Sequence, residues 1–181
     1  MTTANKITIL RILLVPIFMA LLLIDDLRCQ IAALVVFVIA SATDGIDGYI
    51  ARHYNQVTTF GKFMDPLADK MLTTAAFLVL LEKGAVSSVP VMIVMAREFA
   101  VAGIRMIAGS DGKVIAASML GKIKTVMQMV AIVAAIILLN PAFPEVTAQL
   151  ITDILIWIST AITIISGIDY IWKNKEMLGN K

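Results

Sequence analysis

Long apolar runs separated by short polar breaks dominate the hydrophobic pattern of this chain. A helix of about 20 mostly apolar residues crosses a bilayer, and six runs are of that order. They cover roughly residues 7–24, 31–52, 61–81, 86–107, 116–139 and 146–172. The breaks between them carry charges, glycine or proline, as in Glu82-Lys83-Gly84 and Asn140-Pro141. The pattern predicts an all-α integral membrane protein with six transmembrane helices.

The composition supports this prediction and narrows the function. Of the 181 residues, 60% are hydrophobic, whereas soluble domains have about 45–50% apolar residues. The length fits one membrane domain over residues 1–181. The net charge of +2 is small and the basic residues are scattered, which argues against a nucleic acid partner. Cys29 is the only cysteine, so neither an intramolecular disulfide nor a thiolate metal cluster can form.

The distribution of lysine and arginine predicts the orientation in the membrane, because cytoplasmic loops carry an excess of both. With the N-terminus inside, only Arg28 and Lys83 of the 15 basic residues fall in outer loops, and Lys70 and Arg97 fall within spans. The remaining eleven are then on the inner side: Lys6, Arg11, Arg52, Lys62, Arg105, Lys113, Lys122, Lys124, Lys173, Lys175 and Lys181. Both termini are therefore expected in the cytoplasm.

Four aspartates interrupt the second and third apolar runs near that inner side. At 100° per residue, the two aspartates of the second helix and two small residues fall within an arc of roughly 100° around the helix axis. The two aspartates of the third helix and a glycine fall within an arc of about 80°. These residues are Asp44, Asp47, Gly48 and Ala51 on the second helix, and Gly61, Asp65 and Asp69 on the third. The short connection makes the two helices neighbours. Four carboxylates are thus expected to converge at one cytoplasmic site.

A divalent cation would explain such a cluster. An aspartate at the centre of a membrane helix costs about 2.5–3.5 kcal/mol, and four gathered carboxylates also repel one another. Oxygen ligands favour Mg²⁺ or Mn²⁺, and two such ions about 3.5–4 Å apart are common in phosphoryl chemistry. Arg52 is suited to a phosphate. The alternative is a set of ion-paired or helix-capping aspartates, with the glycines serving helix packing.

The spacing Asp44-x2-Asp47-Gly48-x2-Ala51-Arg52-x8-Gly61-x3-Asp65-x3-Asp69 resembles the signature of the CDP-alcohol phosphatidyltransferases. The resemblance implies six transmembrane helices, a homodimer and two divalent cations. It also implies that Asp44, Asp47 and Asp65 are metal ligands and that Asp69 is both ligand and general base. The residues implied to contact the CDP-activated lipid are Asn5, Thr8, Gly48, Ala51, Arg52, Thr58 and Gly61.

Other stretches resemble the bacterial members that use sn-glycerol 3-phosphate as the acceptor: residues 5–11, Arg97-Glu98-Phe99, 121–125 and 166–170. The resemblance implies transfer of the phosphatidyl group from CDP-diacylglycerol to sn-glycerol 3-phosphate, at the cytoplasmic face of a bacterial cell membrane. Other acceptors, such as inositol phosphate or serine, stay open. A small cation carrier is the alternative from another class, since intramembrane carboxylates also mark ion pathways.

An anionic acceptor needs cations. Lys62, Arg97, Arg105 and Lys122 are candidates for its phosphate. The alternatives are a buried pair of Arg97 with Glu98 or an aspartate, and contacts of the others with anionic lipid headgroups. Lys124 is expected to be an interfacial charge.

Overall fold

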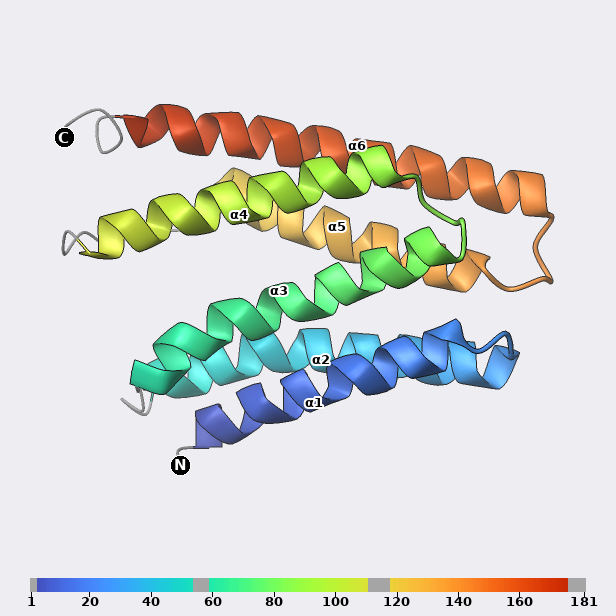
Figure 1. Cartoon of the computed structure of the whole chain (residues 1–181), viewed down its shortest axis with the longest axis horizontal. Coiled ribbons are helices and arrows are strands. Elements are labelled where there is room, and N and C mark those ends of the chain that lie inside the picture. Colours follow the sequence, from blue (N-terminus) through green and yellow to red (C-terminus); the bar gives the residue numbers. More distant parts are fainter. Residues whose placement is uncertain (1–2, 54–58, 111–117, 176–181) are drawn as a thin grey trace. The chain divides into compact units, whose positions relative to one another are not determined.

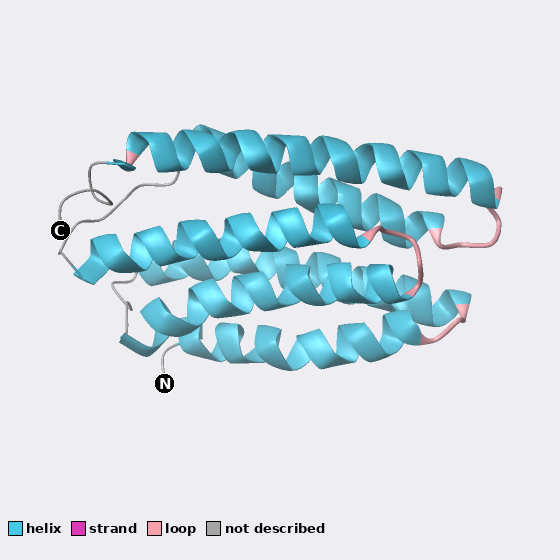
Figure 2. Cartoon of the chain, turned by 45° about the horizontal axis from the view of Figure 1, so that its top comes forward, coloured by secondary structure: helices cyan, strands magenta, loops and turns pink. Residues whose placement is uncertain are grey.

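The computed structural model describes residues 3–53, 59–110 and 118–175. Within these ranges all regular secondary structure is helical and no strand occurs (Figure 2). The helices are α1 (Thr3–Leu23), α2 (Leu27–His53), α3 (Thr59–Glu82), α4 (Ser88–Ser110), α5 (Met119–Leu138) and α6 (Glu145–Lys173). The six predicted helices are confirmed, with ends that differ by a few residues.

The six helices, which are labelled in Figure 1, form two compact units. Unit 1 comprises Met1–Lys83 with Leu139–Ala142, and unit 2 comprises Gly84–Leu138 with Phe143–Lys181. Helices α1 to α3 thus belong to unit 1 and α4 to α6 to unit 2. The single membrane domain over residues 1–181 stays a prediction.

In unit 1, α1 packs against both α2 and α3. Its buried side chains recur every three or four residues and so form one face of the helix: Thr8, Arg11, Val15, Phe18 and Leu22. The Phe18 ring meets the Phe37 ring of α2, with 5.6 Å between their centroids. Small residues on α2 and α3, including Ala33, Ala40, Ala68 and Ala76, are fully buried and allow the close approach of the helices.

A polar side chain and a glycine mark two helix boundaries, the start of α2 and the end of α3. The Asp26 carboxylate accepts the backbone N–H groups of Arg28 and Cys29 at 2.8 and 3.3 Å, which caps the start of α2. After α3, Gly84 adopts a φ of 72°, a left-handed conformation that glycine adopts without a steric penalty. These local signals place the helix boundaries close to the predicted polar breaks.

In unit 2, α6 packs along α4 and α5. Its buried face is built from small and hydroxyl-bearing residues: Ala148, Thr152, Ile156, Ser159, Thr160, Thr163, Ser166, Gly167 and Tyr170. The Thr160 and Thr163 hydroxyls donate to the carbonyl oxygens of Ile156 and Ser159 at 2.8 and 2.7 Å. Such bonds satisfy these two hydroxyls within the helix, whereas the buried Ser159 Oγ on the same face has no hydrogen-bond partner among the described residues.

In the part of the chain whose side chains the structure describes, two helices, α5 and α6, are long and apolar enough to cross a membrane by length and composition. Shorter apolar helical stretches run over Thr8–Leu23 and Leu27–Thr43. Charged residues interrupt the apolar character of the remaining helices: Arg97, Glu98 and Arg105 lie within α4. Large apolar side chains are nevertheless exposed on every helix, among them Leu13, Val35, Leu78, Met92, Val126 and Ile165. This exposure fits a lipid environment.

Candidate active site

The two halves of the aspartate signature lie on the facing ends of consecutive helices. Asp44 and Asp47 belong to the last turns of α2, and Asp65 and Asp69 to the first turns of α3. The two helices contact each other, as predicted, and both pack against α1. Both halves of the aspartate signature therefore belong to one group of three packed helices, α1, α2 and α3.

The side chains of residues 44–67 and of Asp69 lie outside the described part of the structure, as does residue 58 as a whole. This range includes the signature residues Gly48, Ala51, Arg52 and Gly61, and the acceptor candidate Lys62. The convergence of the four carboxylates on one site therefore stays a prediction. The side chain of Asn5, in the first turn of α1, is likewise outside the described residues.

The face of α1 that packs against α2 and α3 carries two buried polar residues. Thr8, predicted to contact the nucleotide, is fully buried, and Arg11, one turn further, is only 1% exposed. Both side chains have interaction partners. Arg11 was predicted only as an inner-side charge, which stays a prediction, and its burial between helices was not predicted. The helical spacing of residues 8, 11, 15, 18 and 22 is the feature of the sequence that would have predicted the burial of Arg11.

Arg97 of α4 is held by a neighbour in sequence and by α6. Its Nη1 donates to Glu98 Oε1 at 3.2 Å, and its Nη2 donates to Ser166 Oγ at 2.8 Å. The Arg97 side chain is 13% exposed and that of Glu98 9%. The pairing of Arg97 with Glu98, which was the alternative to a phosphate role, is thus present. It occupies only part of the guanidinium, which has five N–H donors.

Arg105, two turns further along α4, has a separate support. Its Nε donates to the Tyr170 hydroxyl at 3.3 Å, and its guanidinium carbon lies 5.5 Å from the centre of the Tyr170 ring. Tyr170 is 2% exposed and packs against Val101 and Ile104, so its ring is fixed. The Arg105 side chain is exposed and thus accessible to a ligand. The two arginines have different partners on α6 and share none of these contacts.

The two lysines at the start of α5 differ in their exposure. Lys122 is exposed, whereas Lys124 is 5% exposed and forms an ion pair with Glu98. The prediction of Lys124 as an interfacial charge is wrong because its side chain points to the face of α5 that packs in unit 2. Gln128, Ala131, Ile132 and Ala135 continue this buried face at helical spacing. That periodicity was the available signal.

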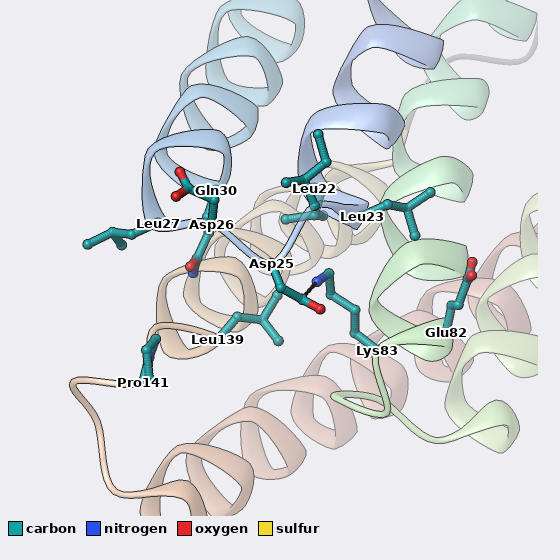
Figure 3. Close-up of a pocket in the computed structure, with 11 residues that line it drawn as sticks. Leu22, Leu23, Asp25, Asp26, Leu27, Gln30, Glu82, Lys83, Leu139 and Pro141 are labelled. Carbon is teal, nitrogen blue, oxygen red and sulfur yellow. Dashed lines mark hydrogen bonds and ion pairs between the residues drawn. The ribbon is translucent and has the colours of Figure 1, made fainter.

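A cavity of about 500 Å³ lies at the other end of unit 1, where α1 ends and α2 begins (Figure 3). Asp25 and Lys83 form an ion pair across it at 2.5 Å, and Asp26, Gln30 and Glu82 also line it. Along α2, 18 residues separate Asp26 from Asp44, which corresponds to roughly 27 Å. The cavity is therefore distinct from the signature, and its carboxylates are not part of the predicted metal site.

The signature fits divalent cations by its donor chemistry. Four carboxylates supply only hard oxygen ligands, which suit Mg²⁺ or Mn²⁺, and they come from two helices that contact each other. Among the residues whose side chains the structure describes, no group of three or more histidine, cysteine, aspartate or glutamate residues could hold a metal. The four aspartates, whose side chains lie outside the described residues, stay the predicted metal ligands.

Comparisons with known proteins identify the family. The CDP-alcohol phosphatidyltransferase profile matches residues 1–165. A protein from Bacillus subtilis is 43% identical over 186 residues, which span 96% of this chain and 95% of its own. One from Rickettsia typhi is 38% identical over 92% of this chain and 93% of its own, and one from Escherichia coli K12 is 35% identical over 70% and 71%. All three are named CDP-diacylglycerol–glycerol-3-phosphate 3-phosphatidyltransferase. This chain therefore belongs to the CDP-alcohol phosphatidyltransferase family.

Proposed function

We propose that this chain transfers the phosphatidyl group of CDP-diacylglycerol to sn-glycerol 3-phosphate, giving phosphatidylglycerophosphate and CMP. The similarity to relatives named for this reaction carries the proposal, because it extends over more than nine tenths of both chains for the Bacillus and Rickettsia proteins. The aspartate signature supports the phosphatidyl transfer. The residues of α4 to α6, which the alignment also covers, bear on the choice of acceptor.

In the proposed reaction, Asp69 accepts the proton of the attacking primary hydroxyl of the acceptor. Together with Asp44, Asp47 and Asp65 it would hold two divalent cations, Mg²⁺ or Mn²⁺. When bound, these ions supply charge neutralisation at the pyrophosphate of the donor lipid. Arg52 is suited to the nucleotide phosphates because its guanidinium binds them bidentately.

Small and polar residues would complete the donor site. Gly48 and Ala51, on the same face of α2 as the aspartates, leave space for the CDP moiety, and Gly61 does the same on α3. Asn5, Thr8 and Thr58 would bind the nucleotide. Arg11 adds a buried positive charge one turn from Thr8, on the α1 face that packs against both signature helices.

The acceptor carries a phosphate monoester, and the described basic residues of unit 2 match that charge. Arg97 and Arg105 are each supported by α6, and Lys122 is exposed at the start of α5. Supported guanidinium groups bind phosphate well because little side-chain freedom is lost on binding. Lys62 stays a fourth candidate. The family assignment and the names of the three relatives, which are all transferases, disfavour a small cation carrier.

The proposed setting is a bacterial cell membrane, crossed by all six helices, with both termini and the signature on the cytoplasmic side. Arg11 and Lys124 are buried and no longer count as loop charges. Without them, nine of the eleven basic residues remain on the inner side, against two in the outer loops. The exposed apolar side chains would contact membrane lipids and a second copy in a homodimer.

This orientation predicts a labelling pattern in a Cys29→Ala background. A cysteine replacing Lys113 should react with a membrane-impermeant maleimide only in inverted vesicles, because that segment would lie in the cytoplasm. A cysteine replacing Ser87, which is exposed between α3 and α4, should react in intact cells. The reverse pattern would contradict the topology and the access of the site to cytosolic substrate.

The acceptor is tested directly with purified full-length protein, CDP-diacylglycerol and Mg²⁺. We expect release of CMP with sn-glycerol 3-phosphate. Turnover should be lower by at least about 100-fold with glycerol, serine or inositol phosphate, since an acceptor that lacks the phosphate, or places it differently, leaves the cations of the acceptor site unpaired. Preferred use of serine or inositol phosphate would overturn the proposed acceptor while leaving the family assignment intact.

A further inference from the structure

Three helices of unit 2 meet around the Arg97 side chain. Glu98 and Ser166 accept its Nη1 and Nη2 hydrogen bonds, from α4 and α6 respectively. Lys124 of α5 donates to the same Glu98 oxygen that Arg97 contacts. Gly167 of α6 lies against the stem of the arginine. We refer to Glu98, Lys124, Ser166 and Gly167 as the Arg97 support residues.

Arg97, Glu98 and Lys124 together carry two positive charges and one negative charge, and little of these side chains is exposed. Arg97 and Lys124 share the single carboxylate of Glu98, so the three side chains together carry one net positive charge. Glu98 and Lys124 are 7% and 5% exposed. Within the described part of the chain, Arg97 Nε is buried and has no hydrogen-bond partner. Buried donors are nearly always paired, so Arg97 retains both charge and hydrogen-bonding capacity for an anion.

Gly167 leaves room for the Arg97 side chain, which packs directly against its backbone. A Cβ at this position would lie 3.0 Å from Arg97 Cγ and 4.0 Å from its Cβ and Nε. The first distance is shorter than ordinary van der Waals contact. Because Glu98 and Ser166 already hold the far end of the side chain, the stem cannot retreat without displacing the guanidinium. The absent side chain at Gly167 therefore sets where the guanidinium lies.

We infer that Glu98 and Gly167 are positioning residues, which fix the Arg97 guanidinium for the phosphate of the acceptor alcohol. Lys124 serves this arrangement by holding the Glu98 carboxylate from a third helix. The physical reason is preorganisation: an arginine fixed before the substrate arrives binds a phosphate with less loss of side-chain freedom. The inference rests on the proposed function, because it assigns the anion to the acceptor of that reaction.

The first test moves Arg97 without changing any charge. Gly167→Ala should raise the KM for sn-glycerol 3-phosphate by about 10-fold, since displacements below 1 Å already weaken a positioned contact strongly. The KM for CDP-diacylglycerol should stay within about twofold. Gly103→Ala is the matched control, because it makes the same change on α4 where a Cβ meets nothing within 4 Å. It should leave both KM values unchanged.

A second variant separates positioning from charge and does not depend on the folding of Gly167→Ala. Glu98→Gln keeps the shape of the side chain but removes its negative charge, so the local charge becomes more positive. If only charge mattered, the KM for sn-glycerol 3-phosphate would fall. Positioning predicts a rise of about 10-fold or more, because the Arg97 Nη1 loses its charged acceptor on Glu98. Ser166→Ala, which removes one neutral acceptor, should raise that KM by a smaller factor.

The outcomes distinguish this inference from the proposed function. A wild-type protein that does not turn over sn-glycerol 3-phosphate overturns the proposed function itself. If the wild type uses this acceptor and both Gly167→Ala and Glu98→Gln keep its KM, the support residues have no part in acceptor binding and the inference is wrong. A lower melting temperature with unchanged KM values would likewise assign these residues to stability alone.

Discussion

Replacing Asp69 with asparagine should reduce kcat by at least about 100-fold, because general base catalysis typically contributes 10²- to 10⁴-fold and the same substitution also weakens a metal ligand. Asparagine has nearly the shape of aspartate but neither its charge nor its basicity. The change should therefore leave membrane insertion and the melting temperature almost intact. Asp44→Asn, Asp47→Asn and Asp65→Asn should each cause a loss of similar size, measured as CMP release.

Asp25→Asn is the matched control for this series. Asp25 lies in the same unit, but its carboxylate is 93% exposed and is paired with Lys83 at the far end from the signature. The same substitution there should leave kcat unchanged. Removing divalent cations with a chelator should stop the wild type, and added Mg²⁺ should restore it. An enzyme that retains full activity after exhaustive chelation would contradict the proposal of two bound cations.

The second prediction is that two sets of substitutions affect different substrates, because the acceptor and the CDP-activated lipid are assigned to different residues. Arg105→Ala and Lys122→Ala should each lower kcat/KM for sn-glycerol 3-phosphate by roughly 10- to 150-fold, the equivalent of losing a charge-assisted hydrogen bond of about 1.5–3 kcal/mol. Their KM for CDP-diacylglycerol should change little. Arg52→Ala should do the reverse, since it removes a charge from the nucleotide side. Steady-state kinetics with each substrate varied in turn measure both effects.

Lys173→Ala provides the control for loss of a basic residue in unit 2. Lys173 is exposed and pairs with Asp169 one turn earlier on α6, at 2.8 Å. Exposed pairs of this kind contribute about 0–1 kcal/mol, and no substrate role is assigned to this one. Both kinetic constants should be unaffected. If Arg105→Ala and Lys122→Ala behave like this control, the acceptor phosphate binds elsewhere.

Tyr170 explains why the Arg105 prediction depends on the tertiary structure. Residues 105 and 170 are 65 positions apart in the sequence, yet the hydroxyl and ring of Tyr170 support the guanidinium. Tyr170 lies in a stretch whose sequence resembles the family, and no contact was predicted for it. Helical periodicity identifies the face on which a residue lies, but not which residue of a distant helix faces it.

The sequence by itself determined the helices and the chemistry of the signature. Apolar runs and polar breaks are local features, so the six helices begin and end within a few residues of their predicted positions. The contact between α2 and α3 followed from the short connection between them. The donor type followed from the residues alone, since carboxylates supply only oxygen ligands, and the binding of metal ions by them stays a prediction.

Only the tertiary structure decided which charged residues are buried and what each of them contacts. Lys124 was predicted to be an interfacial charge and Arg11 was counted as an inner-side charge, but each lies on a helix face covered by neighbouring helices. Glu98 was recognised as a partner of Arg97 but not as the carboxylate shared with Lys124, 26 positions away. The close approach of Gly167 to Arg97 depends on how α4 and α6 pack. Burial and pairing of a charge depend on the facing helix, and that information is not local in the sequence.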